Sequence, residues 1–415
     1  MQSFIKNRHI NIRHLVLLFL IPLALNSCKD QDDDTSKTEN ETLVSYQKIS
    51  SIAAQNIQGA FTLISIAYPE IAKLNFSNLS DVEIYKVKYK TSLNNKEVIA
   101  SGLVCIPKKV GSYPVISFQN GTNTSNSGAP SQNTTNEQFA LLENLSGMGY
   151  IVTIPDYIGF GESNNILHPY YHRESSDASV INLVKACLEI LAEKPTGATS
   201  NGKLMLLGYS QGGWATLSAF KTLEENNTTG LEPVAASCGA GAYNLNDIAK
   251  HILSLNTYNS PAYLPYFIES HMRNGLMNTG LTTYFNQTYA DKIPALFDGQ
   301  KHLGSINSAL NDTISRLMTA EMIQGFANDS KFLDLREELQ ENSVDAWNVK
   351  GKLFFVHGKS DTTVPVFESE NMVAKFRALG VDETKVQLVL LDGINHGSGV
   401  LPWAIKSLVW LDAMK

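Results

Sequence analysis

From residue 41 onward, two patterns of apolar and polar positions follow one another along the chain. Short apolar runs of strand length are followed by longer stretches in which apolar residues recur at helical spacing. The runs predict strands at 82–89, 98–106, 114–119, 150–155, 204–207, 233–237, 352–357 and 386–391, and helices at 138–145, 177–193, 214–225, 368–379 and 401–414. Strands that alternate with helices form an α/β fold with a mainly parallel, doubly wound sheet. An antiparallel hairpin, turned at Leu93-Asn94-Asn95, is expected to begin it.

The segment before the first of these strands has a different pattern of apolar residues. Its apolar residues, among them Ile49, Ile52, Ile57 and Phe61, fall near helical spacing. We therefore expect residues 43–67 to form an N-terminal helical segment.

The interval 243–347 interrupts the alternation. It is mostly helical in pattern and carries many aromatic residues: Tyr258, Tyr263, Tyr266, Phe267, Tyr284, Phe285, Tyr289 and Phe297. An insertion at this point would cover the C-terminal edge of the sheet, where open α/β folds bind ligands. We expect a helical cap at 243–347 on a core made of 43–242 and 348–415. Most of the aromatic residues should form the cap's own core, and a few should face the site.

The beginning of the chain has the pattern of a secretory signal peptide. Lys6, Arg8 and Arg13 precede Leu15–Leu25, an apolar run of eleven residues. That run is too short to span a bilayer, which needs about 20 residues. A basic start and a short apolar centre predict that residues 1–27 are removed during secretion.

Cys28 follows directly after the small residue Ser27, which resembles a bacterial lipid-attachment site. The acidic run 29–34 resembles the tether of Bacteroidetes-type lipoproteins. The expectation is a lipidated Cys28, an acidic tether at 28–42, and a membrane anchor that places the protein in the outer membrane, on its inner or outer face. An ordinary cleaved signal with an incidental cysteine is the alternative.

Charge and cysteine usage narrow the function classes. The 33 basic and 40 acidic residues give a net charge of −7, and removal of residues 1–27 takes three basic residues and no acidic one, which leaves −10. This balance argues against a nucleic-acid partner, which requires a basic face. Cys105, Cys187 and Cys238 lie in apolar runs, where we expect buried thiols and no disulfide framework.

The stretch Lys203–Thr216 carries the clearest candidate chemistry. An apolar strand-like run, Leu204–Leu207, meets Gly208-Tyr209-Ser210-Gln211-Gly212, a G-x-S-x-G pattern, and a helical pattern follows. Strand, tight turn and helix are the context of a nucleophile elbow, which presents the serine at the top of a sheet. A glycine-rich turn in some other α/β protein is the alternative. In the elbow, the helix N-terminus favours an oxyanion, and the backbone N–H of Gln211 would be one donor to it.

A serine needs a base to accept its proton and an acid to orient that base, in the chain order serine, acid, histidine in this fold. Asp361 follows the predicted strand 352–357, and His396 follows the next strand, 386–391. Asp361 is therefore the expected acid and His396 the expected base. Asp392 competes with Asp361 but lies too close to His396 in sequence to orient it in the usual way.

A second oxyanion donor is expected in the loop after the strand 114–119. That loop reads Asn120-Gly121-Thr122. We expect the N–H of Thr122 to be the donor, with that of Gly121 as the alternative.

Together these residues resemble the α/β-hydrolase superfamily and, within it, the secreted lipase and esterase group. The resemblance covers the chain from about residue 82 to its end. It rests on Pro155-Asp156-Tyr157-Ile158-Gly159-Phe160-Gly161, on the elbow, on His357-Gly358 with Asp361 and Val364-Pro365, and on the late His396. The family pattern has His-Gly where this chain has Asn120-Gly121. The resemblance implies hydrolysis of carboxylic esters through an acyl-enzyme, with neither a cofactor nor a metal.

The elbow does not fix the substrate, because one fold serves many substrates. A serine aminopeptidase of the same fold would need a cap carboxylate to bind the substrate amine, for which Glu269 and Glu321 are available. A carbohydrate acetyl or feruloyl esterase is a further alternative. A binding lipoprotein on an inactive hydrolase scaffold is opposed by the complete and correctly ordered triad.

Overall fold

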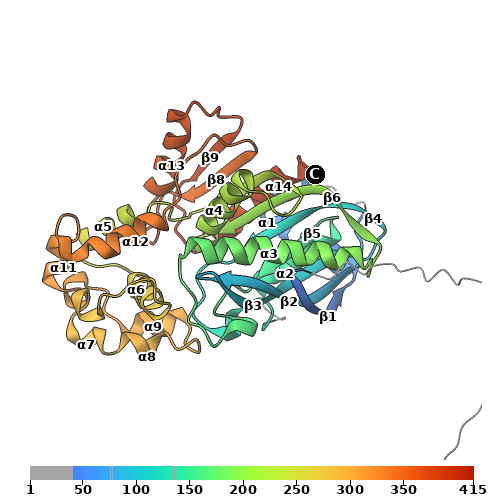
Figure 1. Ribbon diagram of the computed structural model, residues 1–415. Helices are drawn as coiled ribbons and strands as arrows, with labels where there is room; N and C mark the ends of the chain where they lie inside the picture. Colours follow the sequence, from blue (N-terminus) through green and yellow to red (C-terminus); the bar gives the residue numbers. More distant parts are fainter. Residues whose placement is uncertain (1–40, 75, 77, 134–136) are drawn as a thin grey trace, which may run out of the picture. The chain divides into compact units, whose positions relative to one another are not determined.

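The computed structural model describes residues 41–74, 76, 78–133 and 137–415 (Figure 1). The expected leader 1–27, Cys28 and nearly all of the tether 28–42 lie outside the described residues. Among the helices of the described part, none combines the length and apolar character needed to cross a membrane.

A sheet runs through the described part of the chain, with nine strands in the order β1-β2-β3-β5-β4-β6-β7-β8-β9. The strands are β1 Leu43–Ile52, β2 Val82–Leu93, β3 Lys96–Pro107, β4 Gly111–Gln119, β5 Ile151–Pro155, β6 Ala198–Tyr209, β7 Glu232–Gly239, β8 Lys352–Gly358 and β9 Val386–Leu391. The pairs β1–β2, β2–β3 and β3–β5 are antiparallel, and every other neighbouring pair is parallel. The mainly parallel α/β sheet is therefore confirmed. Asn94 and Asn95, both with positive φ, turn the β2–β3 hairpin.

The expectation of a helix over residues 43–67 is wrong for its first half. Residues Leu43–Ile52 form the edge strand β1, and the helix α1 covers only Ala54–Ala67. The pairing of β1 with β2 is irregular between Leu43 and Ser45 and again between Lys48 and Ser50, where β1 holds an extra residue each time. A bulge displaces the alternation of a strand by one position. The apolar residues therefore recur every three positions, which imitates helical spacing.

Helices cover both faces of the sheet and give it two apolar cores. On one face, α1, α2 (Glu137–Gly147) and α14 (Val400–Asp412) supply buried side chains such as Phe61, Leu142 and Trp403. On the other, α3 (Arg173–Ala192), α4 (Gln211–Glu225) and α13 (Phe367–Ala378) supply residues such as Val184, Trp214 and Phe376. Cys105, Cys187 and Cys238 are buried in these cores as free thiols, and burial raises the pKa of each.

The chain between β7 and β8 is built from short helices (Figure 1). These are α5 Leu245–Ser254, α6 Tyr263–Arg273, α7 Gln287–Ala290, α8 Ile293–Leu296, α9 Leu303–Ala309, α10 Ile314–Leu317, α11 Ala320–Gly325 and α12 Leu333–Glu341. Tyr284, Phe285 and Phe297 are buried among them. We refer to this segment, residues 243–347, as the insertion. Its apolar side chains are continuous with the core on the α3 and α4 face of the sheet.

A buried carboxylate joins the end of the insertion to the sheet core. Glu224, near the end of α4, accepts hydrogen bonds from Trp347 Nε1 at 2.7 Å and from the backbone N–H groups of Lys350 and Gly351 at 3.0 and 2.6 Å. A buried acceptor with several donors is costly to remove, because each donor is then left without a partner. The carboxylate of Glu224 therefore fixes the chain where it re-enters the sheet as β8.

Replacing this carboxylate should weaken the fold. We expect Glu224→Ala to lower the free energy of unfolding by about 2–4 kcal/mol, because one buried donor and two partly buried donors lose their acceptor. The matched control is the exposed neighbour Glu225→Ala, which removes only a surface pair with Lys221 and should cost less than about 0.5 kcal/mol. Urea unfolding of the two variants measures both values. Equal losses would show that Glu224 does not hold this junction.

Candidate active site

Ser210 lies in the sharp turn between β6, which ends at Tyr209, and α4, which begins at Gln211. Its backbone has φ 60° and ψ −124°, a conformation that costs a non-glycine residue of the order of 1–3 kcal/mol. Two hydrogen bonds hold it there: the N–H of Ser210 donates to Gly239 O at 2.8 Å, and its C=O accepts from the N–H of Gly213 at 2.9 Å. The surrounding backbone therefore maintains the strain at this serine.

Glycines make this turn possible because other backbone segments approach them closely. A Cβ on Gly208 would lie 2.3 Å from Gly212 O, and a Cβ on Gly212 would lie 2.0 Å from Gln119 O. Neither contact is sterically possible, and backbone atoms cannot move aside as a side chain can. The two glycines that flank Ser210 in the motif thus allow β4, β6 and α4 to converge at this serine.

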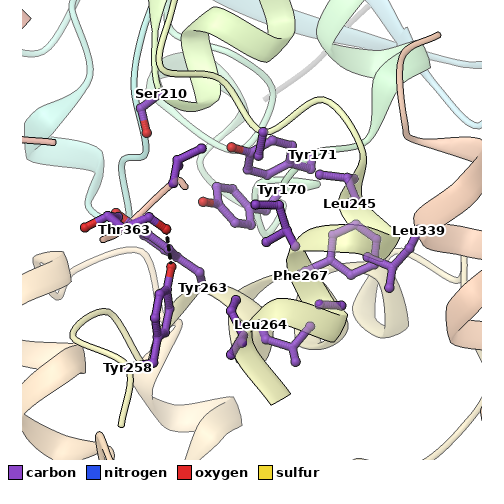
Figure 2. Close-up of a pocket in the computed structure, with 15 residues that line it drawn as sticks. Tyr170, Tyr171, Ser210, Leu245, Tyr258, Tyr263, Leu264, Phe267, Leu339 and Thr363 are labelled. Atoms are coloured by element: carbon purple, nitrogen blue, oxygen red, sulfur yellow. Dashed lines mark hydrogen bonds between the residues drawn. The ribbon is translucent and has the colours of Figure 1, made fainter. Parts of the chain in front are cut away.

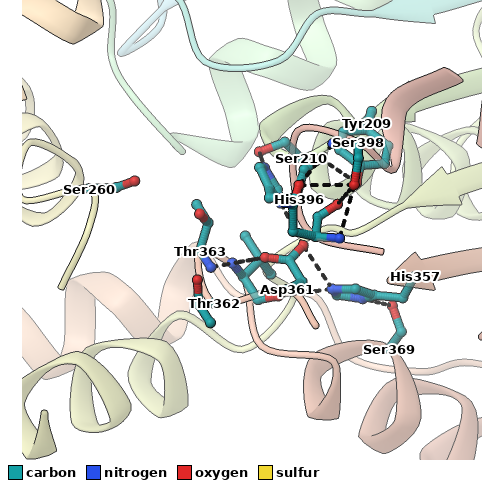
Figure 3. Close-up of polar contacts among 12 residues, drawn as sticks. Tyr209, Ser210, Ser260, His357, Asp361, Thr362, Thr363, Ser369, His396 and Ser398 are labelled. Atoms are coloured by element: carbon teal, nitrogen blue, oxygen red, sulfur yellow. Dashed lines mark hydrogen bonds and ion pairs between the residues drawn. The ribbon is translucent and has the colours of Figure 1, made fainter. Parts of the chain in front are cut away.

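A chain of two hydrogen bonds links Ser210 to a histidine and a carboxylate (Figure 3). His396 Nε2 lies 2.9 Å from Ser210 Oγ, and His396 Nδ1 lies 2.6 Å from Asp361 Oδ2. Asp361 follows β8 and His396 follows β9, so the loops at the ends of adjacent parallel strands bring them together. Because a carboxylate only accepts, Nδ1–H donates to Asp361, and Nε2 is left to accept the serine proton.

Asp361 is held as a carboxylate by its surroundings. Burial alone would raise its pKa, but hydrogen bonds from His357 and His396 and from the backbone N–H of Val364 outweigh burial and hold the pKa of Asp361 well below its usual range. Its Oδ1 accepts from the N–H groups of Thr363 and Val364, each at 2.9 Å. The acid therefore keeps its negative charge next to His396 at neutral pH.

The competing acid, Asp392, lies elsewhere. Its exposed carboxylate pairs with Lys359 Nζ at 2.7 Å, while Asp361 Oδ2 is the carboxylate oxygen that contacts the ring of His396. The geometry favours Asp361 as the orienting acid.

The three residues expected around the oxyanion lie next to Ser210. Gln211 is the first residue of α4, so its N–H belongs to the positive end of a helix. Gly121 passes so close that a Cβ on it would lie 4.0 Å from Ser210 Cβ. Thr122 is held by a contact of 2.7 Å between its Oγ1 and the hydroxyl of Tyr170. Gly121, Thr122 and Gln211 line one cavity together with Ser210.

Sequence reasoning missed His168. This buried histidine lies with Nε2 2.9 Å from the side-chain nitrogen of Gln211 and Nδ1 2.7 Å from the carbonyl oxygen of Ile158. The carbonyl must accept from Nδ1–H, so Nε2 accepts from the amide of Gln211. Burial lowers the pKa of His168 to about 4 and keeps the ring in this neutral form. The only signal in the sequence was the neighbouring motif Asp156–Gly161, because Tyr157 and Phe160 pack against its ring.

Asp156, in the same motif, supports a loop. Its carboxylate accepts from Ser101 Oγ at 2.6 Å and from the N–H of Ser131 at 2.8 Å. These contacts fix the chain after β4 against the end of β5, away from the hydrogen bonds that join Ser210, His396 and Asp361.

Two cavities of very different size meet at Ser210. The smaller, of about 60 Å³, extends from Ser210 among apolar side chains of the insertion, including Tyr258 and Tyr263 (Figure 2). The larger, of about 910 Å³, is lined by Gly121, Thr122, Gln211 and His396. Within residues 41–74, 76, 78–133 and 137–415, no cluster of three or more His, Cys, Asp or Glu side chains could hold a metal ion.

Comparisons with known proteins bear on the fold and the family of the chain. No curated protein shows significant sequence similarity to the chain. Among solved structures, it is similar to a candidate hydrolase from Legionella pneumophila, with 27% identity over 90% of this chain and 98% of the other and a TM-score of 0.78. It also matches the rice cell wall degrading esterase LipA from Xanthomonas oryzae, with 22% identity, coverage of 90% and 97% and a TM-score of 0.75.

A third structure, Candida antarctica lipase A in its closed state, is 16% identical, with coverage of 90% of this chain and 83% of the other and a TM-score of 0.64. These likenesses show that the fold is that of the α/β-hydrolases. The profile of the family described as secretory lipase matches residues 125–414, which is well over half of the chain. The chain therefore belongs to the secretory lipase family and is, at the level of that family, a carboxylic ester hydrolase.

Proposed function

We propose that this protein is a serine hydrolase that cleaves carboxylic esters through an acyl-enzyme, with Ser210 as nucleophile, His396 as general base and Asp361 as orienting acid. The observation that carries the proposal is the pair of hydrogen bonds at 2.9 and 2.6 Å that joins these three side chains in order. This arrangement can activate a serine hydroxyl, which is otherwise a poor nucleophile.

The proposed reaction has two half-reactions. Ser210 Oγ forms a bond to the ester carbonyl carbon while His396 Nε2 takes its proton, and the tetrahedral intermediate then expels the alcohol, which receives that proton from His396. Water, deprotonated by His396, attacks the acyl-enzyme, releases the carboxylic acid and restores Ser210. Asp361, kept ionised by its hydrogen bonds, stabilises the imidazolium in both halves.

The backbone N–H of Gln211 and that of Thr122, or of Gly121 in its place, would stabilise the negative charge on the carbonyl oxygen. Donors fixed in advance at that position supply much of the rate acceleration in acyl transfer. His168 acts as a positioning residue here, because it holds the side chain of Gln211.

Of the two alternatives, the aminopeptidase is the weaker on this geometry. Neither Glu269 nor Glu321 lines the two cavities at Ser210: Glu269 is buried in a pair with Arg273 at 3.0 Å, and Glu321 lies 3.4 Å from Lys331. An aminopeptidase would therefore lack the expected carboxylate for its substrate amine. A carbohydrate acetyl or feruloyl esterase shares the proposed chemistry, and only the substrate separates it from a lipase.

Removal of the nucleophile tests the proposal. We expect Ser210→Ala to lower turnover of 4-nitrophenyl butanoate by ~10⁴-fold or more, because triad members act as a unit. The variant should keep its circular dichroism spectrum and lose labelling by a fluorophosphonate. Ser308→Ala, whose exposed hydroxyl donates to Gly304 O within α9, should retain activity and labelling. Near wild-type turnover by Ser210→Ala would remove Ser210 from the mechanism.

A second comparison separates the two acids. Asp361→Asn should lower kcat by ~10³–10⁴-fold, because an amide no longer stabilises the imidazolium or fixes its tautomer. Asp392→Asn should change kcat by less than about threefold, since it loses only an exposed pair with Lys359. Steady-state kinetics of both variants give the ranking. The opposite ranking would exchange the two carboxylates.

We also propose that the secreted protein is a lipoprotein anchored through Cys28. This rests on the sequence pattern of the leader, Ser27-Cys28 and the acidic run after it. Acyl chains contribute about 0.8 kcal/mol per buried CH₂, so two or more chains hold a protein firmly on a membrane.

The anchor has its own test. The full-length protein should sediment with membranes and resist a salt wash, whereas Cys28→Ser should be soluble or remain unprocessed, with catalytic activity unchanged. Fractionation of cells that express each form measures this. Equal membrane retention of Cys28→Ser and wild type would refute the anchor. For the wild-type protein, protease shaving of intact cells reports on which face of the membrane it lies.

A further inference from the structure

The two cavities at Ser210 differ in which catalytic residues they touch. His396, Gln211, Gly121 and Thr122 line the large cavity, whereas the small one includes Ser210 without any of them. Besides the serine oxygen, three groups are bonded to the tetrahedral carbon: the oxyanion, the oxygen of the leaving alcohol and the acyl substituent. Each must point in a different direction.

The chemistry assigns those directions, given the proposed mechanism. The oxyanion must point to the donors at Gln211 and Thr122. The leaving oxygen must lie within reach of His396 Nε2, because that nitrogen returns the proton. Both sets of residues face the large cavity. The acyl substituent is therefore directed into the small cavity, which Ser210 reaches and His396 does not.

The side chains around the small cavity suit a hydrocarbon. None of the described residues that line it is charged. Two of its phenol hydroxyls already have partners, since Tyr258 donates to Thr363 O at 2.8 Å and Tyr170 lies 2.7 Å from Thr122 Oγ1. Aliphatic side chains of α5, α6 and α12 form much of the remaining wall (Figure 2). An acyl chain that enters it leaves both of these hydroxyls paired.

The volume sets the length of that chain. A cavity of about 150 Å³ holds one benzene molecule, which is roughly 25 Å³ for each carbon. The 60 Å³ of the small cavity thus has room for about two or three carbons beyond the carbonyl carbon. The large cavity, with 910 Å³ and walls that are partly polar at Asn123 and His302 and partly apolar at Leu142, has room for a bulky alcohol.

We propose that this enzyme acts on esters of short acyl groups, of about two to four carbons, with a bulky alcohol: the acyl group enters the small cavity within the insertion, and the alcohol occupies the large cavity at His396. The inference rests on the proposed function of Ser210 and His396, and it adds the substrate class.

The test is a series of 4-nitrophenyl esters from acetate to decanoate, at concentrations below micelle formation. We expect kcat/KM to be highest between acetate and butanoate and to fall at least about tenfold by octanoate. A single methylene group that the cavity cannot accommodate lowers kcat/KM by a factor of about ten or more. A wild-type optimum at octanoate or longer would overturn the inference.

A matched pair of variants ties the length limit to the small cavity. Leu339 and Leu335 are both buried on α12, but only Leu339 lines the cavity, at the end of the drawn group away from Ser210 (Figure 2). Leu339→Ala should raise the ratio of kcat/KM for hexanoate over acetate at least about tenfold, since it gives room for about three more carbons. Leu335→Ala makes the same truncation outside the cavity and should leave the ratio unchanged. Ratios that shift equally in both variants would overturn the inference.

A filling variant covers the case in which Leu339→Ala does not fold. Ala249 on α5 lines the same cavity, and Ala249→Leu should lower kcat/KM for butanoate while acetate is affected less. An unchanged ratio of kcat/KM for butanoate over acetate would count against the assignment.

If the wild type hydrolyses none of these esters and Ser210 is not labelled by a fluorophosphonate, the proposed function fails. Hydrolysis that depends on Ser210 but is fastest on long chains overturns only the substrate class.

Discussion

The backbone conformation of Ser210 is the constraint on which the site depends. With φ 60° and ψ −124°, the residue is held between β6 and α4 by Gly239 O and by the N–H of Gly213. The flanking glycines allow this because any larger residue would collide with backbone oxygens at 2.0–2.3 Å. The turn fixes Oγ within 2.9 Å of His396 and puts the N–H of Gln211 at the start of a helix. Both cavities begin at the point that this turn defines.

The parts of the site that could be predicted from the sequence are those determined by short sequence motifs and by the order of strands. Glycine spacing and an adjacent strand and helix predicted the turn at Ser210, and the ends of successive strands indicated Asp361 and His396. The edge strand β1 was misread because its two pairing irregularities give apolar residues a spacing of three. The contact of His168 with Gln211 joins residues 43 positions apart, and no local pattern reports such a contact. The cavity volumes depend on side chains of α5, α6 and α12, and could not be predicted either.

The sheet core and the insertion contribute different properties. The core supplies Ser210, Asp361, His396, Gly121, Thr122 and Gln211 from the C-terminal ends of strands and the segments after them. The insertion buries most of its aromatic residues in its own interior, among them Tyr284 and Phe285, and presents a few, such as Tyr258 and Tyr263, to the small cavity. Membership of the secretory lipase family fixes the ester chemistry but not the acyl length. In this account the insertion sets that length, because its side chains close the space beyond Ser210.

The central claim is that Ser210 carries the acyl group during turnover. The most direct measurement is mass spectrometry of the enzyme quenched in acid during hydrolysis of 4-nitrophenyl butanoate, followed by digestion with trypsin. The account predicts one added butanoyl group on the peptide Leu204–Lys221, with fragmentation placing it on Ser210, and its loss as turnover ends. Acylation of a different residue would contradict it. So would an unmodified Ser210 in samples that are quenched during turnover under conditions where deacylation is slowed.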